Sequence, residues 1–126
     1  MWRMTFTYLA EHDAVCARFE KVELVSAADA LRWSTEVALK LRSFGRKVYL
    51  LIDLEGLIVK PTAARDFGRL RAEVLSKYAL ASYRYGGDRP TITTVYTSSV
   101  LHNAAANHYG SFEEAVAAMK RDRAPR

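Results

Sequence analysis

Residues 48–54, with the sequence VYLLIDL, are apolar at every position except Asp53. A short run that is apolar at successive positions, and not only at every second one, is typical of a strand with both faces buried. The run therefore predicts a central strand that is parallel to a neighbour and covered by helices. Asp53, Glu55 and Gly56 close the run and predict a turn at its end.

Upstream of this strand, the pattern predicts a hairpin followed by a helix. Residues 4–10 alternate between apolar and polar side chains, and residues 14–19 resume this strand character after a short polar turn. Residues 27–43 carry apolar side chains at helical spacing, and Ser26 with Asp29 resembles a capping box at the start of that helix.

Downstream, the segments continue to alternate between helix and strand. Residues 62–78 have the pattern of an amphipathic helix, and residues 79–85 predict a short strand. Residues 107–109 are a candidate edge strand, and a second capping box begins a helix that ends near residue 121. Alternation of this kind predicts an α/β domain with a parallel or mixed sheet.

Residues 88–101, taken alone, leave two interpretations open. Asp88 and Pro90 are typical of a helix N-cap and first turn, which favours a helix. The β-branched residues of TITTVYT, residues 91–97, favour a strand.

The composition fits one folded domain. The chain has 126 residues, of which 50% are hydrophobic, six are glycine and three are proline. These values exclude a disordered chain, a collagen-like chain and a multidomain enzyme. The one cysteine, Cys16, cannot form an internal disulfide and is expected to be buried. No apolar run is long enough to cross a membrane and no signal-peptide pattern begins the chain, so we expect a cytoplasmic protein.

The formal net charge is +5 at pH 7, and much of it comes from the last seven residues. Those residues carry four basic side chains and one acidic one, so we expect a domain over residues 1–121 and a solvated basic tail over residues 122–126. Nucleic-acid binding is not expected, because no basic face interleaved with exposed aromatic side chains is evident.

The order of these elements resembles that of the STAS superfamily, especially its SpoIIAA-like branch, the fold of bacterial anti-sigma-factor antagonists. Three stretches carry the resemblance: VYLLIDLEGL at residues 48–57, the amphipathic helix that follows it, and NHYGSFEEAVAAMK at residues 107–120. The resemblance implies a single-domain mixed sheet of about four to five strands with helices packed on it. It also implies a third helix, complete or partial, over residues 88–101.

The resemblance also marks a candidate phosphoacceptor. In anti-sigma-factor antagonists a Ser or Thr at the start of the helix after the central strand is phosphorylated, within a pattern close to Asp-Ser-Ser-Gly. The corresponding sequence here is KPTAA, residues 60–64, in which only Thr62 could accept a phosphate. Because Lys60 stands in place of the upstream Asp and no Gly follows, the resemblance implies a docking domain without the usual phospho-switch.

Carboxylates close two of the predicted strands, at the edge where ligands of open α/β sheets bind. Asp53 and Glu55 follow the central strand and Asp88 follows the next one, so the three could face a ligand such as Mg²⁺. The alternative is structural: Asp53 and Asp88 cap the segments that follow them, and Glu55 is solvated. No zinc-ligand spacing, nucleophile elbow or phosphate loop is present, so we expect no catalytic residue, no metal and no cofactor.

We therefore expect a non-enzymatic domain that binds a partner protein through the loop and the helix after the central strand. Arg65 and Arg69 share a helical face, and Arg84 ends a strand near the same edge. Basic charge there would favour encounter with an acidic partner. The expected partner-binding residues are Leu57, Lys60, Thr62, Arg65, Arg69 and Arg84.

Two other interpretations stay open. A lipid- or nucleotide-binding module would need an apolar cavity between a helix and the sheet. A homodimer would form by self-association through the edge strand of the predicted hairpin.

Overall fold

A computed structural model describes residues 1–124, and residues 125 and 126 lie outside the described part. The elements follow the order β1 (Arg3–Leu9), β2 (Ala14–Glu20), β3 (Val22–Leu24), α1 (Ala27–Arg42), β4 (Val48–Asp53), β5 (Leu57–Val59), α2 (Pro61–Tyr78), β6 (Ala79–Tyr85), α3 (Arg89–His102), β7 (His108–Tyr109) and α4 (Phe112–Arg123). The alternation of strands and helices confirms the predicted α/β class.

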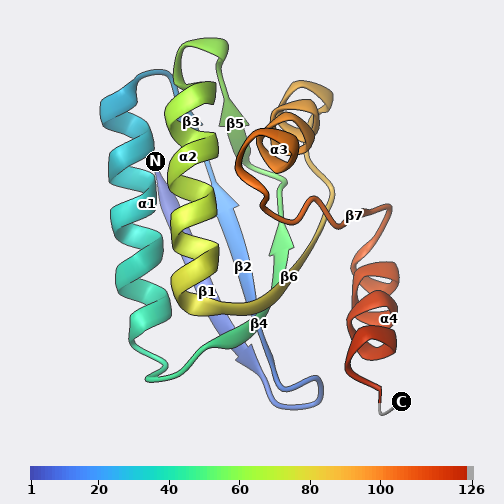
Figure 1. The fold of residues 1–126 in the computed structure, drawn as a ribbon. Coiled ribbons are helices and arrows are strands. Elements are labelled where there is room, and N and C mark those ends of the chain that lie inside the picture. The colour runs from blue at the N-terminus through green and yellow to red at the C-terminus, as the bar shows by residue number, and fades with distance from the viewer. Residues whose placement is uncertain (125–126) are drawn as a thin grey trace.

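β4 is the middle strand of a five-stranded mixed sheet, as the apolar run VYLLIDL predicts. The strands lie in the order β1-β2-β4-β6-β7, with β1 antiparallel to β2 and the other neighbours parallel (Figure 1). Successive residues of β4 point to opposite faces, and Leu50 and Leu51 expose only 2% and 0% of their surface. Cys16, on the neighbouring β2, is also buried, as predicted.

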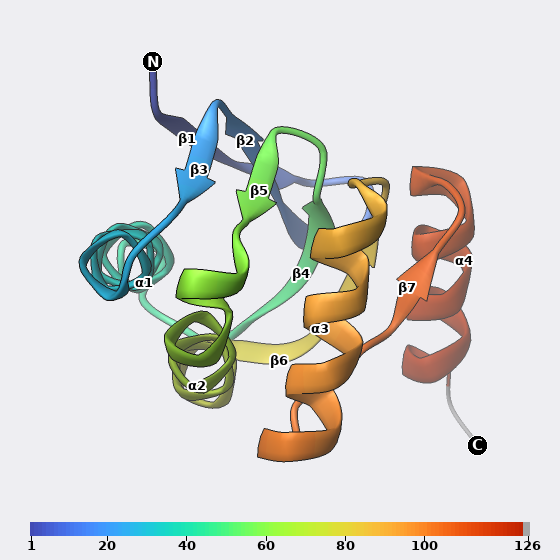
Figure 2. The ribbon, with the colours of Figure 1, turned by 90° about the horizontal axis from the view of Figure 1, so that it is seen from above.

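Helices cover both faces of the sheet. α1, α2 and α3 pack on one face around a core that includes Trp33, Leu50 and Phe67. α4 packs on the other face against Leu51 and Tyr83, and Figure 2 shows it across the sheet from α1 and α2. β1 forms one edge of the five-stranded sheet, so the homodimer expected through this strand remains a prediction.

A second, two-stranded parallel sheet is formed by β3 and β5, and no sequence pattern predicts it. Val22 pairs with Leu57, and the backbone N–H of Val22 donates to the Gly56 carbonyl at 2.9 Å. The segment from residue 57 to residue 62, expected as a loop, therefore begins with a buried strand. Each strand has only three residues, which is too short for an apolar–polar alternation to be recognised.

The two interpretations of residues 88–101 are decided in favour of the helix, since α3 spans Arg89–His102. Asp88 is its N-cap, and the Asp88 carboxylate accepts a hydrogen bond from the backbone N–H of Thr91 at 2.8 Å. Val95 is 1% exposed and lies in the core with residues of α2. Tertiary burial thus overrides the strand propensity of the β-branched residues.

α1 begins with the predicted capping box. Ser26 Oγ accepts a hydrogen bond from the backbone N–H of Asp29 at 3.2 Å, and Asp29 Oδ2 accepts one from the backbone N–H of Ser26 at 3.2 Å. These reciprocal bonds satisfy two backbone donors and fix the start of the helix. Within residues 1–124, no helix is both long enough and apolar enough to cross a membrane.

α4 continues to Arg123, beyond its predicted end near residue 121, and its last turn contacts the β1–β2 turn. The Arg123 guanidinium donates to the His12 carbonyl at 2.7 Å and lies 4.2 Å from the ring centre of Tyr49. Asp122 accepts a hydrogen bond from the Tyr83 hydroxyl at 2.7 Å. Asp122 and Arg123 therefore belong to the folded domain and not to the solvated tail expected over residues 122–126, whose last two residues lie outside the described part.

Gly56, between β4 and β5, offers a test of how closely this turn approaches β2. Its φ is 81°, and an added Cβ would overlap the carbonyl oxygen of Phe19. Gly45 also has a positive φ, 73°, but an added Cβ there would have no neighbour within 4 Å. Gly45→Ala should lower the free energy of unfolding by about 1–2 kcal/mol, the penalty of a left-handed residue with a side chain.

Gly56→Ala should lower the free energy of unfolding by a further 1–3 kcal/mol, roughly the penalty of overpacking, because the turn or β2 must shift. Urea unfolding of both variants measures the difference. Equal losses for Gly45→Ala and Gly56→Ala would contradict the close approach.

Candidate functional site

The six residues expected to bind a partner do not all lie on the surface. The side chains that are exposed are Lys60, Thr62, Arg65 and Arg69. Leu57 is 2% exposed because it belongs to β5, which pairs with β3. Arg84 is 1% exposed because its side chain lies beneath the helices, against the segment that follows α3. Burial removes Leu57 and Arg84 from the predicted docking surface.

Lys60 and Thr62 begin α2 and contact the segment that precedes α1. Lys60 is the N-cap residue, and its Nζ lies 3.9 Å from Glu23 Oε1. The hydroxyl of Thr62, the candidate phosphoacceptor, donates a hydrogen bond to the Val25 carbonyl. This bond joins the starts of α1 and α2, so the Thr62 hydroxyl has a structural partner in this fold.

Arg69 and Arg65 differ in how their charges are balanced. Arg69 lies 3.5 Å from Asp66 Oδ1 and 3.5 Å from Glu73 Oε1, which are two acids of its own helix. Exposed pairs of this kind add little stability, but they neutralise charge locally. Arg65 has no ion-pair partner among residues 1–124. Its charge is therefore available to a partner.

Arg65 lies in a groove between α2 and α3, with a volume of about 440 Å³. The two helices approach closely at Gly68, where an added Cβ would lie 2.9 Å from Ser98 Cβ. The groove is lined by Ala64, Arg65, Gly68, Thr93, Thr94, Thr97, Ser98, Leu101 and His102. We call it the α2–α3 groove.

The α3 side of this groove combines a hydroxyl with exposed apolar side chains. Thr97 is exposed, and Leu101 exposes 71% of its surface. Val100 and Tyr96, on the same helix but not in the lining of the groove, expose 85% and 47%. Exposed apolar groups beside an unpaired cation are typical of a surface that binds another chain. The groove can therefore hold a segment that offers a carboxylate and an aliphatic side chain.

The sequence pattern identifies Arg65 but neither Leu101 nor Thr97. The reason is that the groove depends on the packing of α3 against α2, which no periodicity reveals. One signal was present: Gly68 interrupts the amphipathic pattern of residues 62–78, and an isolated glycine in a helix often permits close packing.

The three carboxylates at the strand ends form hydrogen bonds within the protein. Asp53 Oδ1 accepts from the backbone N–H of Glu55 at 2.9 Å, and Glu55 Oε2 accepts from the backbone N–H of Gly87 at 3.1 Å. Asp88 caps α3. Within residues 1–124, no three carboxylate, histidine or cysteine side chains form a group that could hold a metal ion. These contacts match the structural alternative for Asp53 and Asp88, and Glu55 adds a contact to the turn between β6 and α3.

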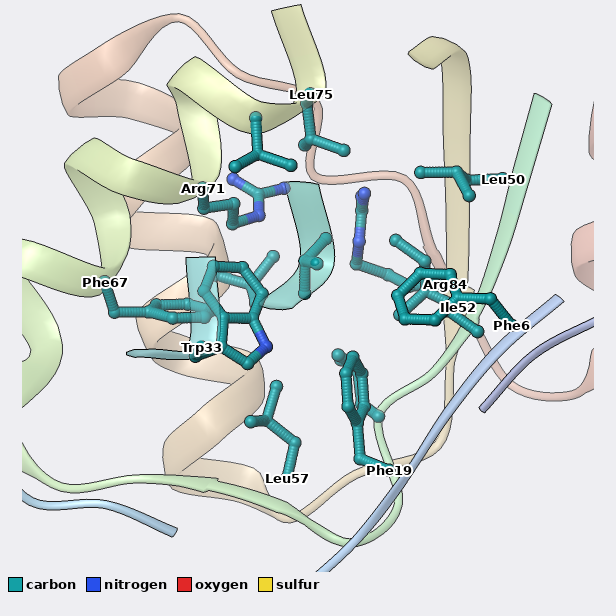
Figure 3. Close-up of a pocket in the computed structure, with 15 residues that line it drawn as sticks. Phe6, Phe19, Trp33, Leu50, Ile52, Leu57, Phe67, Arg71, Leu75 and Arg84 are labelled. Atoms are coloured by element: carbon teal, nitrogen blue, oxygen red, sulfur yellow. The ribbon is translucent and has the colours of Figure 1, made fainter. Parts of the chain in front are cut away.

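A second feature is a cavity of about 40 Å³ beneath α1, α2 and α3 (Figure 3). Two arginines line it: Arg71 on α2 is 4% exposed, and Arg84 on β6 is 1% exposed. Burial lowers the pKa of Arg71 to about 10. Burial also lowers the pKa of Arg84, with a further contribution from the charge of Arg71. Arg71 is not among the site residues that the sequence predicts, although its spacing from Phe67 and Val74 places it on the buried side of α2.

No protein-family model matches the sequence, and no curated protein matches it. Among solved structures, the chain is similar to an uncharacterized protein of the DUF3478 family with a SpoIIAA-like fold, from Shewanella loihica PV-4. The TM-score is 0.57 and the sequence identity is 13%, over 93% of this chain and 94% of the other. The likeness confirms the SpoIIAA-like fold that the resemblance implies, and at this identity it establishes the fold alone.

Asp88 tests the structural role of the strand-end carboxylates. Asp88→Ala should lower the free energy of unfolding by about 1 kcal/mol, because the backbone N–H of Thr91 loses its acceptor. Asp88→Asn keeps a capping oxygen without the charge, so its stability should lie within about 0.5 kcal/mol of the parent protein. Urea unfolding measures both. A loss for Asp88→Asn as large as that for Asp88→Ala would show that the charge has a role beyond capping.

Proposed function

We propose that this SpoIIAA-like domain is a non-enzymatic protein–protein interaction domain whose docking site is the α2–α3 groove. The observation that carries the proposal is the position of Arg65, which has no ion-pair partner among residues 1–124 and lies in one groove with the exposed Leu101. A cation and an aliphatic side chain in one groove provide two anchors for a single segment of a partner chain.

The chemistry of the groove favours a partner segment that carries a carboxylate close to an aliphatic side chain. The carboxylate would pair with Arg65, the aliphatic side chain would contact Leu101, and the Thr97 hydroxyl would bond a polar group of the segment. Charge pairing at such a rim mainly sets the encounter rate and selectivity, whereas apolar burial supplies most of the affinity.

The proposal includes no phospho-switch at Thr62. The sequence around this residue lacks the Asp and the Gly of the anti-sigma-factor antagonist pattern, and Lys60 occupies the upstream position. The Thr62 hydroxyl also donates to the Val25 carbonyl, so a phosphate there would remove a bond that joins the starts of α1 and α2.

A lipid- or nucleotide-binding role has less support than docking. Sites for ligands of that size span about 300–1,000 Å³. The cavity beneath α1, α2 and α3 has a volume of about 40 Å³. A cytoplasmic location and a homodimer formed through β1 remain predictions.

Photo-crosslinking in cells that produce the protein tests the docking site. A photoreactive amino acid at position 97 should give covalent adducts with a partner chain, which mass spectrometry of the adduct identifies. Arg65→Glu should lower the yield of these adducts at least about tenfold, because repulsion replaces the attraction to the partner's carboxylate.

Two controls accompany this experiment. Arg42→Glu makes the same charge reversal on the exposed side of α1, outside the groove, and should leave the adduct yield unchanged. A crosslinker at Thr7 of β1, on the α4 side of the sheet, should not capture the same partner. The assignment of the groove would be refuted if a crosslinker at position 7 captured the partner as efficiently as one at position 97. It would also be refuted if Arg42→Glu lowered the adduct yield as much as Arg65→Glu does.

A further inference from the structure

The two edges of the five-stranded sheet are protected to different degrees. β7 forms one edge with only two residues, whereas β1 forms the other with seven. β1 pairs with β2 along its whole length without a bulge, and residues 4–9 contain neither a charged side chain nor a proline. Short length, bulges, charges and prolines are the features by which edge strands avoid further pairing. β7 has the first of these, and β1 has none of them within residues 4–9.

The outer side of β1 is free in the single chain. Among residues 1–124 no strand pairs with that side, so the backbone groups that point away from β2 have no strand to bond. Thr5 and Thr7 are exposed on the α4 face of the sheet, and Tyr8, on the opposite face, exposes 45% of its surface. β1 therefore presents an unpaired backbone edge together with side chains that another strand can cover.

The sequence of β1 is symmetric in character about Phe6. A threonine precedes and follows Phe6, and Met4 and Tyr8 are the apolar side chains next along the strand on either side. When two copies of such a strand pair antiparallel with Phe6 opposite Phe6, each threonine meets a threonine and each Met4 meets a Tyr8. Thr–Thr, aromatic and sulfur–aromatic pairs all stabilise neighbouring strands. β1 is thus complementary to itself.

We propose that β1 is a homodimer interface, at which the β1 strands of two copies pair antiparallel about Phe6. This register pairs all seven residues of each strand, because Phe6 is the middle residue of Arg3–Leu9. A shift by two residues leaves an end of each strand unpaired, and a shift by one places the threonines against residues of the opposite face. The length and the alternation of the strand therefore fix the register.

Charges at the two ends of the paired strands favour a second copy over an unrelated strand. In this register Arg3 lies opposite Leu9 of the second copy, and Glu11 follows Leu9 on the same face, since both side chains line one hollow. Long side chains reach such diagonal neighbours across a strand pair. Arg3 has Glu20 of its own chain at 3.8 Å, but Glu11 has no ion-pair partner among residues 1–124. Opposite charges therefore meet at both ends, and the two Arg3 side chains stay apart.

The dimer would carry both docking grooves on one side. The two-fold axis of antiparallel strands within one sheet runs perpendicular to that sheet, so α1, α2 and α3 of both copies lie on the same side of it (Figure 2). Two copies of the α2–α3 groove would then face a partner together. Pairing through β1 does not depend on the docking function, since no residue of β1 lines that groove.

Sedimentation velocity of the protein tests whether it self-associates. The expected result is a rise toward the mass of two chains between about 1 µM and 1 mM, the range of weak interfaces. Hydrogen exchange over the same concentrations locates the contact: amides of β1 should become more protected as the concentration rises, and those of β7 should not. A single-chain mass at about 1 mM, or protection that rises elsewhere and not in β1, would overturn the proposal.

Two double variants test the register, because Thr5 of one copy faces Thr7 of the other. Thr5→Glu with Thr7→Glu places like charges opposite each other in both pairs and should raise the dissociation constant of the dimer at least about tenfold. Thr5→Glu with Thr7→Lys places opposite charges there and should dimerise within about threefold of the parent protein. A shift by two residues would place position 5 opposite position 5, or position 7 opposite position 7, and like charges would meet in both variants.

Thr35→Glu with Ser76→Glu is the charge-matched control. Both residues are exposed, on α1 and α2, so this variant should dimerise like the parent protein. Circular dichroism checks that each variant is folded. The register is wrong if Thr5→Glu with Thr7→Lys dissociates as fully as Thr5→Glu with Thr7→Glu. The interface is wrong if Thr35→Glu with Ser76→Glu dissociates to that extent.

Discussion

The structure depends on the removal of both faces of β4 from water. Leu50 lies on one face and Leu51 on the other, so both can be buried only if strands flank β4 and helices cover it on both sides. Its neighbours β2 and β6 are parallel to it, and parallel strands cannot be joined by a tight turn. α1 therefore precedes β4 and α2 follows it as crossover connections, and α4 covers the remaining face. The places of these three helices follow from one hydrophobic strand.

Most of the fold can be predicted from the sequence because hydrophobic periodicity extends over whole elements. The hairpin, α1, α2 and α4 each bury one face and β4 buries both, so each leaves a local pattern. β3 and β5 leave none, since each has three residues and the pair joins Val22 to Leu57, far along the chain. α3 lies between these cases. Asp88 signals its start, its β-branched residues favour a strand, and the contact of Val95 with the core decides the outcome.

The candidate site is less predictable, because charge alone does not tell whether an arginine is at the surface. Arg65 is exposed, as its place on the polar side of an amphipathic helix predicts. Arg84 is buried because the carbonyls of Ala105 and Ala106, in the segment after α3, accept its hydrogen bonds. Those acceptors are backbone groups, and they reach Arg84 only when the chain returns from α3 to β7. No side-chain pattern encodes such a partner, and the same limit hides the α2–α3 groove.

The bond from Arg123 to the His12 carbonyl spans 111 positions of the sequence. A contact of such length closes nearly the whole described chain into a loop, and the entropy of that closure opposes it until the intervening elements are compact. During synthesis the N-terminal hairpin leaves the ribosome first, so its turn lacks this arginine until residue 123 has emerged. The helices α1, α2 and α3 can cover one face of β4 before then, whereas its other face and the hairpin turn have to wait for α4.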